Sequence, residues 1–408
     1  MKAEDHFPPD YAAARASFLS AAQASDLGTT SRVHPSATTR KGKPLFLDTA
    51  MIGERDADAA LLMISATHGV EGYFGSGVQT GMLRERLLKP PKGAKIVLLH
   101  ALNPYGFAWD RRVNEDNADI NRNFVDHDNP PQNAHYDALA EWIAPRDIAQ
   151  ETMRAANARL KLYSGEHGDF ALQEAITKGQ YKHPDGLYFG GNRESWSSLM
   201  LRDVFKEELR GVKRLIVIDF HTGLGPFGHG EMITEDMPGS PGYQRAVKMW
   251  GKRVCSSEAG ESVSAPLTGT VDRAVAKLLP RAELTFAALE AGTIAQREVF
   301  NALRKDNWLH RFAAGKHRDA EAIRREIRAA FYPDTPEWKR KVWKTSREIV
   351  AAALQALKKP RGRHHAELET RCGRCSASAG RGRTCTARRQ SEARARHLPR
   401  HHRGAFGA

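Results

Sequence analysis

Residues 60–72, Ala-Leu-Leu-Met-Ile-Ser-Ala-Thr-His-Gly-Val-Glu-Gly, contain the pattern that decides the fold. The stretch 60–66 is short and apolar, which is typical of a buried strand in a parallel sheet. His68 and Glu71 come directly after it, so we expect both in the loop at the carboxyl end of that strand. Ligands of open α/β sheets gather at this edge.

A second apolar run, residues 214–220, ends directly in His221. If both runs are parallel strands, the side chains of His68, Glu71 and His221 can meet at one edge of the sheet. Two imidazoles and one carboxylate leave a fourth coordination position open, which is the arrangement of a catalytic zinc site. The alternative for His68 and Glu71 alone is a solvated loop pair, and the second histidine after a second strand favours the metal site.

Two further segments carry a resemblance to a known family. Asn-Pro-Tyr-Gly at 103–106 follows a predicted strand at 95–101, and Asp-Ile-Asn-Arg-Asn-Phe occupies 119–124. Together with His-Gly-Val-Glu-Gly and Asp-Phe-His-Thr-Gly, these segments resemble the zinc carboxypeptidase superfamily, most of all a bacterial branch near the succinylglutamate desuccinylases and aspartoacylases. The resemblance runs from about Tyr11 to Leu357.

The resemblance implies a role for each matching residue. It assigns one zinc ion per chain to His68, Glu71 and His221. Arg112 would polarise the scissile carbonyl, and Arg111 remains a rival for that role. Asn121 and Arg122 would bind a substrate carboxylate, and a guanidinium fork suits a carboxylate because it can bind both oxygens. The alternative for this last pair is an Asn-capped turn beside a surface arginine.

The general base must be a carboxylate close to the attacking water. The apolar run 284–289 reads as another buried strand and ends in Glu290, the position of the family's catalytic glutamate. Glu283 opens the same strand, roughly 23 Å away, and is expected at the surface. Residues 261–281 lack the tyrosine that digestive carboxypeptidases place before this glutamate. Tyr188 is a candidate substrate-facing replacement, although a packed aromatic is the favoured reading of it.

These observations predict a zinc-dependent hydrolase that cleaves an amide bond next to a free carboxylate, either carboxypeptidase-like or an N-acyl amino acid deacylase. The expected partner is therefore a peptide or small molecule with a free carboxylate. The alternatives are a catalytically inactive zinc- or ligand-binding protein, and nucleic-acid contact through the basic end of the chain.

Alternating strand and helix signals predict one α/β domain over 1–359, with a central mixed, mostly parallel twisted sheet flanked by helices. Helices are expected at 10–23, 73–88, 201–209, 242–251, 295–303, 318–331 and 337–357. Residues 126–135 and 165–191 are expected to be loop-rich. The domain holds one cysteine, Cys255, which excludes a disulfide framework there and favours a cytoplasmic location. Since we find neither a signal peptide nor a membrane-length apolar run, no membrane contact is expected.

The last 49 residues, 360–408, differ sharply in composition. They carry 12 Arg, no Lys and 3 Glu, and so contribute +9 of the formal net charge of +14. Too few large apolar residues are present to form a core, so we expect a disordered tail. A shifted reading frame near residue 360 is our hypothesis for its origin, and an RNA-contacting arm is the alternative. No specific nucleic-acid partner is expected for the domain itself.

Overall fold

The computed structural model describes residues 1–358, so the calls on the tail at 360–408 lie outside the described residues. Within 1–358, eight strands form one mixed sheet in the order β1-β2-β4-β3-β5-β8-β6-β7. The strands are β1 (Thr29–Thr38), β2 (Pro44–Gly53), β3 (Ala59–Ile64), β4 (Ala94–His100), β5 (Arg214–Thr222), β6 (Gly230–Thr234), β7 (Val254–Ser256) and β8 (Glu283–Ala291). The four central strands β4, β3, β5 and β8 run parallel, and their outer neighbours β2 and β6 run antiparallel to them. The predicted mixed, mostly parallel sheet is therefore confirmed.

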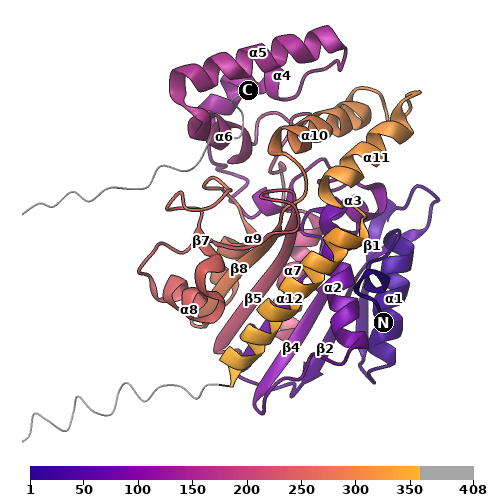
Figure 1. Ribbon diagram of the computed structural model, residues 1–408, viewed down its shortest axis with the longest axis vertical. Coiled ribbons are helices and arrows are strands. Elements are labelled where there is room, and N and C mark those ends of the chain that lie inside the picture. The colour runs from indigo at the N-terminus through magenta and orange to yellow at the C-terminus, as the bar shows by residue number, and fades with distance from the viewer. Residues whose placement is uncertain (359–408) are drawn as a thin grey trace, which may run out of the picture. The chain divides into compact units, whose positions relative to one another are not determined.

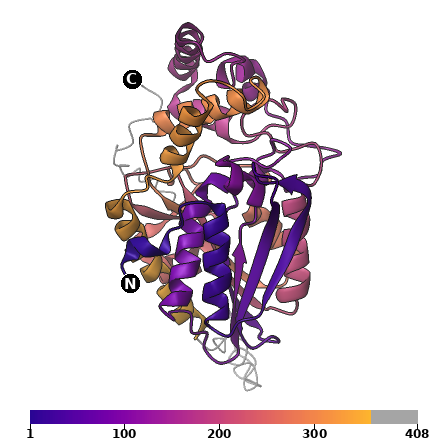
Figure 2. The same cartoon turned by 90° about the vertical axis from the view of Figure 1, so that its right-hand side faces the viewer.

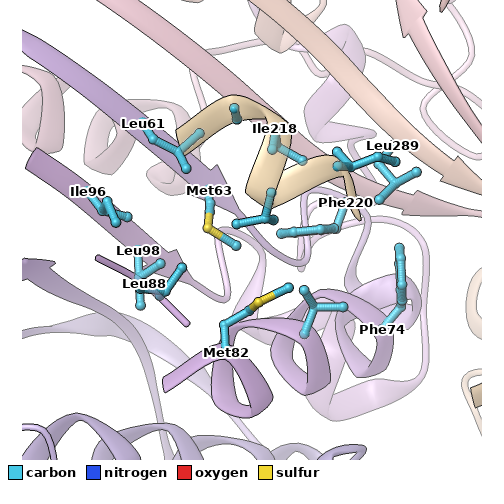
Figure 3. Close-up of a cluster of buried hydrophobic side chains, with 14 of the residues drawn as sticks. Leu61, Met63, Phe74, Met82, Leu88, Ile96, Leu98, Ile218, Phe220 and Leu289 are labelled. Atoms are coloured by element: carbon cyan, nitrogen blue, oxygen red, sulfur yellow. The ribbon is translucent and has the colours of Figure 1, made fainter. Parts of the chain in front are cut away.

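One face of the sheet is covered by four helices: α1 (Tyr11–Gln23), α2 (Gly72–Arg84), α8 (Pro241–Trp250) and α12 (Pro336–Leu357). Alternate side chains of the central strands point to this face, because the side-chain period of a strand is two. Figure 3 shows Leu61, Met63, Ile218 and Phe220 from the sheet near Met82 of α2. Figure 1 shows α12 running across the sheet, and Figure 2 shows α1 and α2 side by side.

The opposite face packs on α7 (Trp196–Glu208) and α9 (Val271–Leu278). The strand residues that alternate with the first set, such as Leu62, Val97 and Val217, are buried there. At this face the side chains of Asp219, His221 and Glu290 lie nearer the carboxyl ends of their strands and line a cavity.

A separate buried cluster joins helices at the end of the domain that Figure 1 draws at the top. These helices are α4 (Ala134–Ile143), α5 (Gln150–His167), α6 (Asp169–Thr177), α10 (Gln296–Arg311) and α11 (Ala320–Phe331). The short helix α3 (Pro104–Trp109) is not part of this cluster and packs against the turn after β3. The expectation that 165–191 is loop-rich was wrong for its first part, because α6 occupies 169–177. No helix within 1–358 has the length and apolar character needed to cross a bilayer.

Several other elements were not predicted from the sequence: β1, β6, β7, α3, α4, α5 and α9. In α5 only Ala156, Leu160 and Tyr163 are buried, so its apolar stripe is narrow and the rest of the helix is polar. Strand β1 is mostly exposed, so it lacks the apolar pattern of a buried strand, and it is held in the sheet by its antiparallel pairing with β2. Other expectations held closely: the helix predicted at 10–23 is α1 at Tyr11–Gln23, α12 ends at Leu357, and Glu283 is exposed at the start of β8.

Candidate functional site

The turn that follows β3 is held against the segment that contains the two candidate arginines. The amide of Gly69 donates to the carbonyl of Arg112 at 3.1 Å, and the amide of Val70 donates to that of Arg111 at 2.8 Å. A Cβ at position 69 would lie 2.0 Å from the carbonyl carbon of Gly106, so only glycine allows this approach. The His-Gly-Val-Glu motif and the arginine segment therefore form one local unit.

His68, Glu71 and His221 converge as the sequence predicts, and all three are buried. His68 Nδ1 lies 2.9 Å from Glu71 Oε1 and 3.2 Å from His221 Nδ1, and His221 Nδ1 lies 3.2 Å from Glu71 Oε2. Nitrogen ligands at the usual zinc distance and tetrahedral angle are about 3.3 Å apart. The donor atoms and their spacing thus fit a zinc ion.

Two aspartates that the sequence did not single out hold the outer nitrogens of these histidines. Asp119 Oδ1 lies 3.1 Å from His68 Nε2, and Asp219 Oδ2 lies 2.9 Å from His221 Nε2. The hydroxyl of Thr67 donates to Asp219 at 2.8 and 2.9 Å. A carboxylate on one ring nitrogen fixes the tautomer and leaves the other nitrogen free for a metal. For Asp219 the sequence did offer a signal, because an acidic residue interrupts the apolar run 214–220 two residues before the candidate ligand His221.

The electrostatics of the cluster favour a charged carboxylate beside a histidine that holds its proton. Although burial opposes ionisation, the two histidines lower the pKa of Glu71. Burial also opposes charge on His221, but Asp219 and then Glu71 hold the pKa of His221 well above its ordinary value. A cation is therefore favoured between these groups, and a metal would replace the proton on His221.

Glu290 stands beside this cluster, because it pairs with His221 in the register of β8 and β5. It is 7% exposed, and its Oε1 accepts a hydrogen bond of 2.9 Å from the amide of Leu224. Burial, followed by the charge of Glu71, raises the pKa of Glu290 to about 8. A carboxylate whose pKa lies near neutrality is suited to accept and return a proton.

The structure separates the two candidate arginines. Arg112 lines the cavity, where its Nε donates to Asp119 Oδ2 at 2.9 Å and its Nη1 lies 3.3 Å from Glu71 Oε1. Arg111 points elsewhere and pairs with buried Asp306, with 3.1 Å between Nε and Oδ2. Of the two guanidinium groups, only that of Arg112 faces the cluster of His68, Glu71 and His221.

Asn121 and Arg122 both line the same cavity. Arg122 is buried, not a surface residue, and donates from Nε and Nη2 to the carbonyl of Thr177 and from Nη1 to that of Asn121. These bonds use three of the five N–H donors of its guanidinium. Within residues 1–358 Arg122 forms no ion pair, and burial lowers its pKa. The nearby charge of Asp119 opposes this shift only in part, so an anionic ligand would be favoured beside the buried guanidinium.

Tyr188 also reaches the cavity and is nearly buried. Its ring centre lies 5.3 Å from the guanidinium carbon of Arg112 and 5.7 Å from that of Arg122. Its φ of 54° lies in the left-handed region, which is unusual for a bulky side chain. Burial raises the pKa of its hydroxyl, which therefore stays protonated and able to donate.

With the exception of Arg111, the site residues predicted from the sequence all line one cavity of about 120 Å³. Its lining also contains residues that the sequence did not suggest, among them Gln173, Glu235, Ser257, Thr270 and Asp272. They lie on segments far from the motifs along the chain, and only the fold brings them to the site.

Comparisons with solved structures return metallopeptidases and an aspartoacylase relative, the groups named by the motif resemblance. Carboxypeptidase A from Helicoverpa armigera is 12% identical, with a TM-score of 0.46 over 85% of this chain and 73% of that chain. A metallo-carboxypeptidase from Pseudomonas aeruginosa is 14% identical, with a TM-score of 0.39 over 84% and 69%. An aspartoacylase family protein from Mesorhizobium loti is 14% identical, with a TM-score of 0.34 over 70% and 67%. The likeness is one of fold and says nothing of a substrate.

No curated protein matches the chain in sequence. A family model described as "Protein of unknown function (DUF2817)" matches residues 7–345, and the chain therefore belongs to this family.

Proposed function

We propose that this protein is a zinc-dependent hydrolase that cleaves an amide bond next to a free carboxylate. One observation carries the proposal: the ligand triad that fits zinc, the buried Glu290, and Arg122, which forms no ion pair within residues 1–358, line the same cavity. His68, Glu71 and His221 would hold the metal. When bound there, zinc would act as a Lewis acid and lower the pKa of a water molecule.

The side chains around the triad supply the remaining parts of such a reaction. Glu290 would accept a proton from the attacking water and return it to the leaving amine, a role that its raised pKa suits. Arg112 would stabilise the negative charge that develops on the carbonyl oxygen. Because Asp119 accepts its Nε–H, the guanidinium of Arg112 is already oriented before a substrate arrives.

Arg122 and Asn121 support the requirement for a free carboxylate. Arg122 is a buried cation with unused donors and no ion pair in the described part of the chain, so a substrate carboxylate would offset the cost of burying its charge. The ring of Tyr188 lies near both guanidinium groups, and its hydroxyl could donate a hydrogen bond to the same carboxylate. Peptides and N-acyl amino acids both offer this carboxylate next to an amide.

The decisive experiment measures zinc content and hydrolysis in the same preparations. Zinc-loaded protein is assayed against peptides and N-acyl amino acids, and Glu290→Gln should keep zinc while kcat falls roughly 10²–10⁴-fold. Glu283→Gln is the matched control, because Glu283 is exposed at the opposite end of the same strand. Near-parental activity in Glu290→Gln would assign the base elsewhere. Glu231 would be the next residue to test, because it lies opposite Glu290 in the antiparallel register of β6 and β8. Absence of zinc from the parent would refute the proposal itself.

A further inference from the structure

A buried polar network surrounds Arg111, the candidate arginine that does not face the metal-ligand cluster. Besides its ion pair with Asp306, Arg111 donates from Nη2 to Oδ1 of Asn117 at 3.0 Å. Asn117 and the nearby Asn307 are buried as well. Because a guanidinium carries only donors, it turns the oxygen of the Asn117 amide toward itself and the NH2 group away. Arg111 therefore determines the direction in which Asn117 donates.

The two asparagines of this network hold the chain just before Tyr188. Nδ2 of Asn117 donates to the first carbonyl of the segment 184–186 at 3.0 Å and to the third over a longer 3.4 Å. Nδ2 of Asn307 donates to the carbonyl between them at 2.8 Å. Three successive carbonyl groups are thus fixed by two buried side chains, one from the arginine segment and one from α10.

Tyr188 needs such support because its backbone conformation is unfavourable. Its φ lies in the left-handed region, and a bulky residue keeps that conformation only where the surrounding contacts enforce it. On the other side of Tyr188, the amide of Asp119 donates to the carbonyl of Phe189 at 2.7 Å. Tyr188, Arg111 and Asn117 line one cavity of only about 10 Å³, so little empty space separates the ring from the network.

We propose that Arg111, Asn117 and Asn307 are positioning residues that hold the ring of Tyr188 beside the two guanidinium groups of the candidate site. They would act on a substrate only through Tyr188, because none of the three lines the cavity that contains the candidate metal ligands. The proposal rests on the proposed hydrolase function for what Tyr188 binds. The dependence of the ring on the network is a property of the free protein and can be measured there.

The physical basis is the cost of leaving buried carbonyl groups without donors. Without the amide of Asn117, two carbonyls of the segment 184–186 would lose a buried donor. The segment could regain hydrogen bonds by moving toward water, and Tyr188 could then leave the left-handed region. Its ring centre would move away from Arg112 and Arg122, whose guanidinium carbons now lie 5.3 and 5.7 Å from it. A carboxylate at these arginines would lose the tyrosine hydroxyl as a donor.

NMR of the zinc-loaded protein with isotope-labelled tyrosine Cζ tests the inference without requiring turnover. The chain has nine tyrosines, and the resonance that Tyr188→Phe removes is that of Tyr188. Asn117→Gly is the test variant, because glycine accepts the φ of 62° at this position and only the side chain is lost. The Tyr188 resonance should broaden or move toward that of a solvated tyrosine. Gln79→Ala is the matched control, because the buried amide of Gln79 also donates to two carbonyls, but between β3 and β4.

An unchanged Tyr188 resonance in Asn117→Gly would overturn the inference. An equal change in Gln79→Ala would overturn it too, because the effect would then be a general loosening of the fold. Asn307→Ala is the second variant should Asn117→Gly fail to fold, since it removes the donor to the middle carbonyl and alanine suits the interior of α10. The same change of the resonance is expected there, and its absence would contradict the proposal.

Kinetics separate this inference from the proposed function. If Tyr188 binds the substrate carboxylate, Asn117→Gly and Tyr188→Phe should each raise KM at least about tenfold with kcat near the parental value. The double variant should be no worse than the more impaired single variant, because the network acts through Tyr188. Additive losses would refute that route. Absence of hydrolysis by the parent would refute the proposed function, and the Tyr188 resonance would still decide the inference.

Discussion

Replacing Asp219 by asparagine should weaken zinc binding although Asp219 is not itself a predicted ligand. Asparagine has nearly the same shape, and its amide oxygen can still accept from His221 Nε2, 2.9 Å away in the parent, and from the hydroxyl of Thr67. What disappears is the negative charge that makes His221 a stronger donor to the metal. The substitution therefore tests the electrostatic role of Asp219 separately from its packing.

The expected size of the effect follows from two opposing contributions. Loss of a carboxylate that orients a ligating histidine typically costs about 10–100-fold in metal affinity, or about 1.4–2.7 kcal/mol. However, Asp219 also raises the pKa of His221, and a protonated histidine must lose its proton before it binds a metal. In the Asp219→Asn variant, protons would therefore compete less strongly with zinc for His221. The difference from the parent should therefore be largest at high pH and smaller at low pH.

Competition with a chromophoric chelator at pH 6 and pH 9 measures both contributions. Asp306→Asn is a matched control, because Asp306 is also a buried aspartate that accepts from a basic side chain, that of Arg111, but it lies outside the ligand cluster. It should lower the melting temperature and leave zinc affinity unchanged. Zinc affinity in Asp219→Asn equal to that of the parent at pH 9 would refute the reasoning, and so would a larger loss at pH 6 than at pH 9.

Two further predictions concern the substrate carboxylate and the pH dependence of the metal site. Arg122→Ala should weaken binding of substrates with a free carboxylate by about 1.5–3 kcal/mol and barely affect their amidated forms, as inhibition constants for matched pairs would show. Equal losses for both forms would make Arg122 a structural residue that ties Thr177 to the turn. In the parent, zinc affinity should rise with pH until the raised pKa of His221 is passed, because the folded metal-free protein holds a proton there. Potentiometry should detect proton release on zinc addition, and no release would contradict this protonation state.

The sequence predicted the central strands and the candidate ligands because both carry strong local signals. A continuous apolar run such as 60–66 predicts a strand buried on both faces, and a histidine directly after it marks the functional edge. The register of the parallel strands β5 and β8 then places Glu290 beside His221, because these two residues pair. These relations follow from the general geometry of parallel sheets and need no knowledge of loops.

The parts that the sequence did not predict depend on contacts between distant segments. Asp219 reads as an isolated acid in a strand until the structure shows its bonds to Thr67 and His221. Arg111 and Arg112 are neighbours with the same chemistry, and only the fold decides which one faces the cavity.

Asp119 shows why the motifs at the site should not be treated as independent parts. Its Oδ1 lies against His68 Nε2 and accepts the amide of Asn121, while its Oδ2 accepts Nε of Arg112. One buried carboxylate thus orients a candidate metal ligand, the arginine proposed to polarise the carbonyl, and the turn proposed to bind the substrate carboxylate. Side chains that share a partner are energetically coupled, so effects of substitutions at His68 and Arg112 should not add. We therefore expect a substitution at Asp119 to lower both the zinc affinity and the ability of Arg112 to polarise a carbonyl.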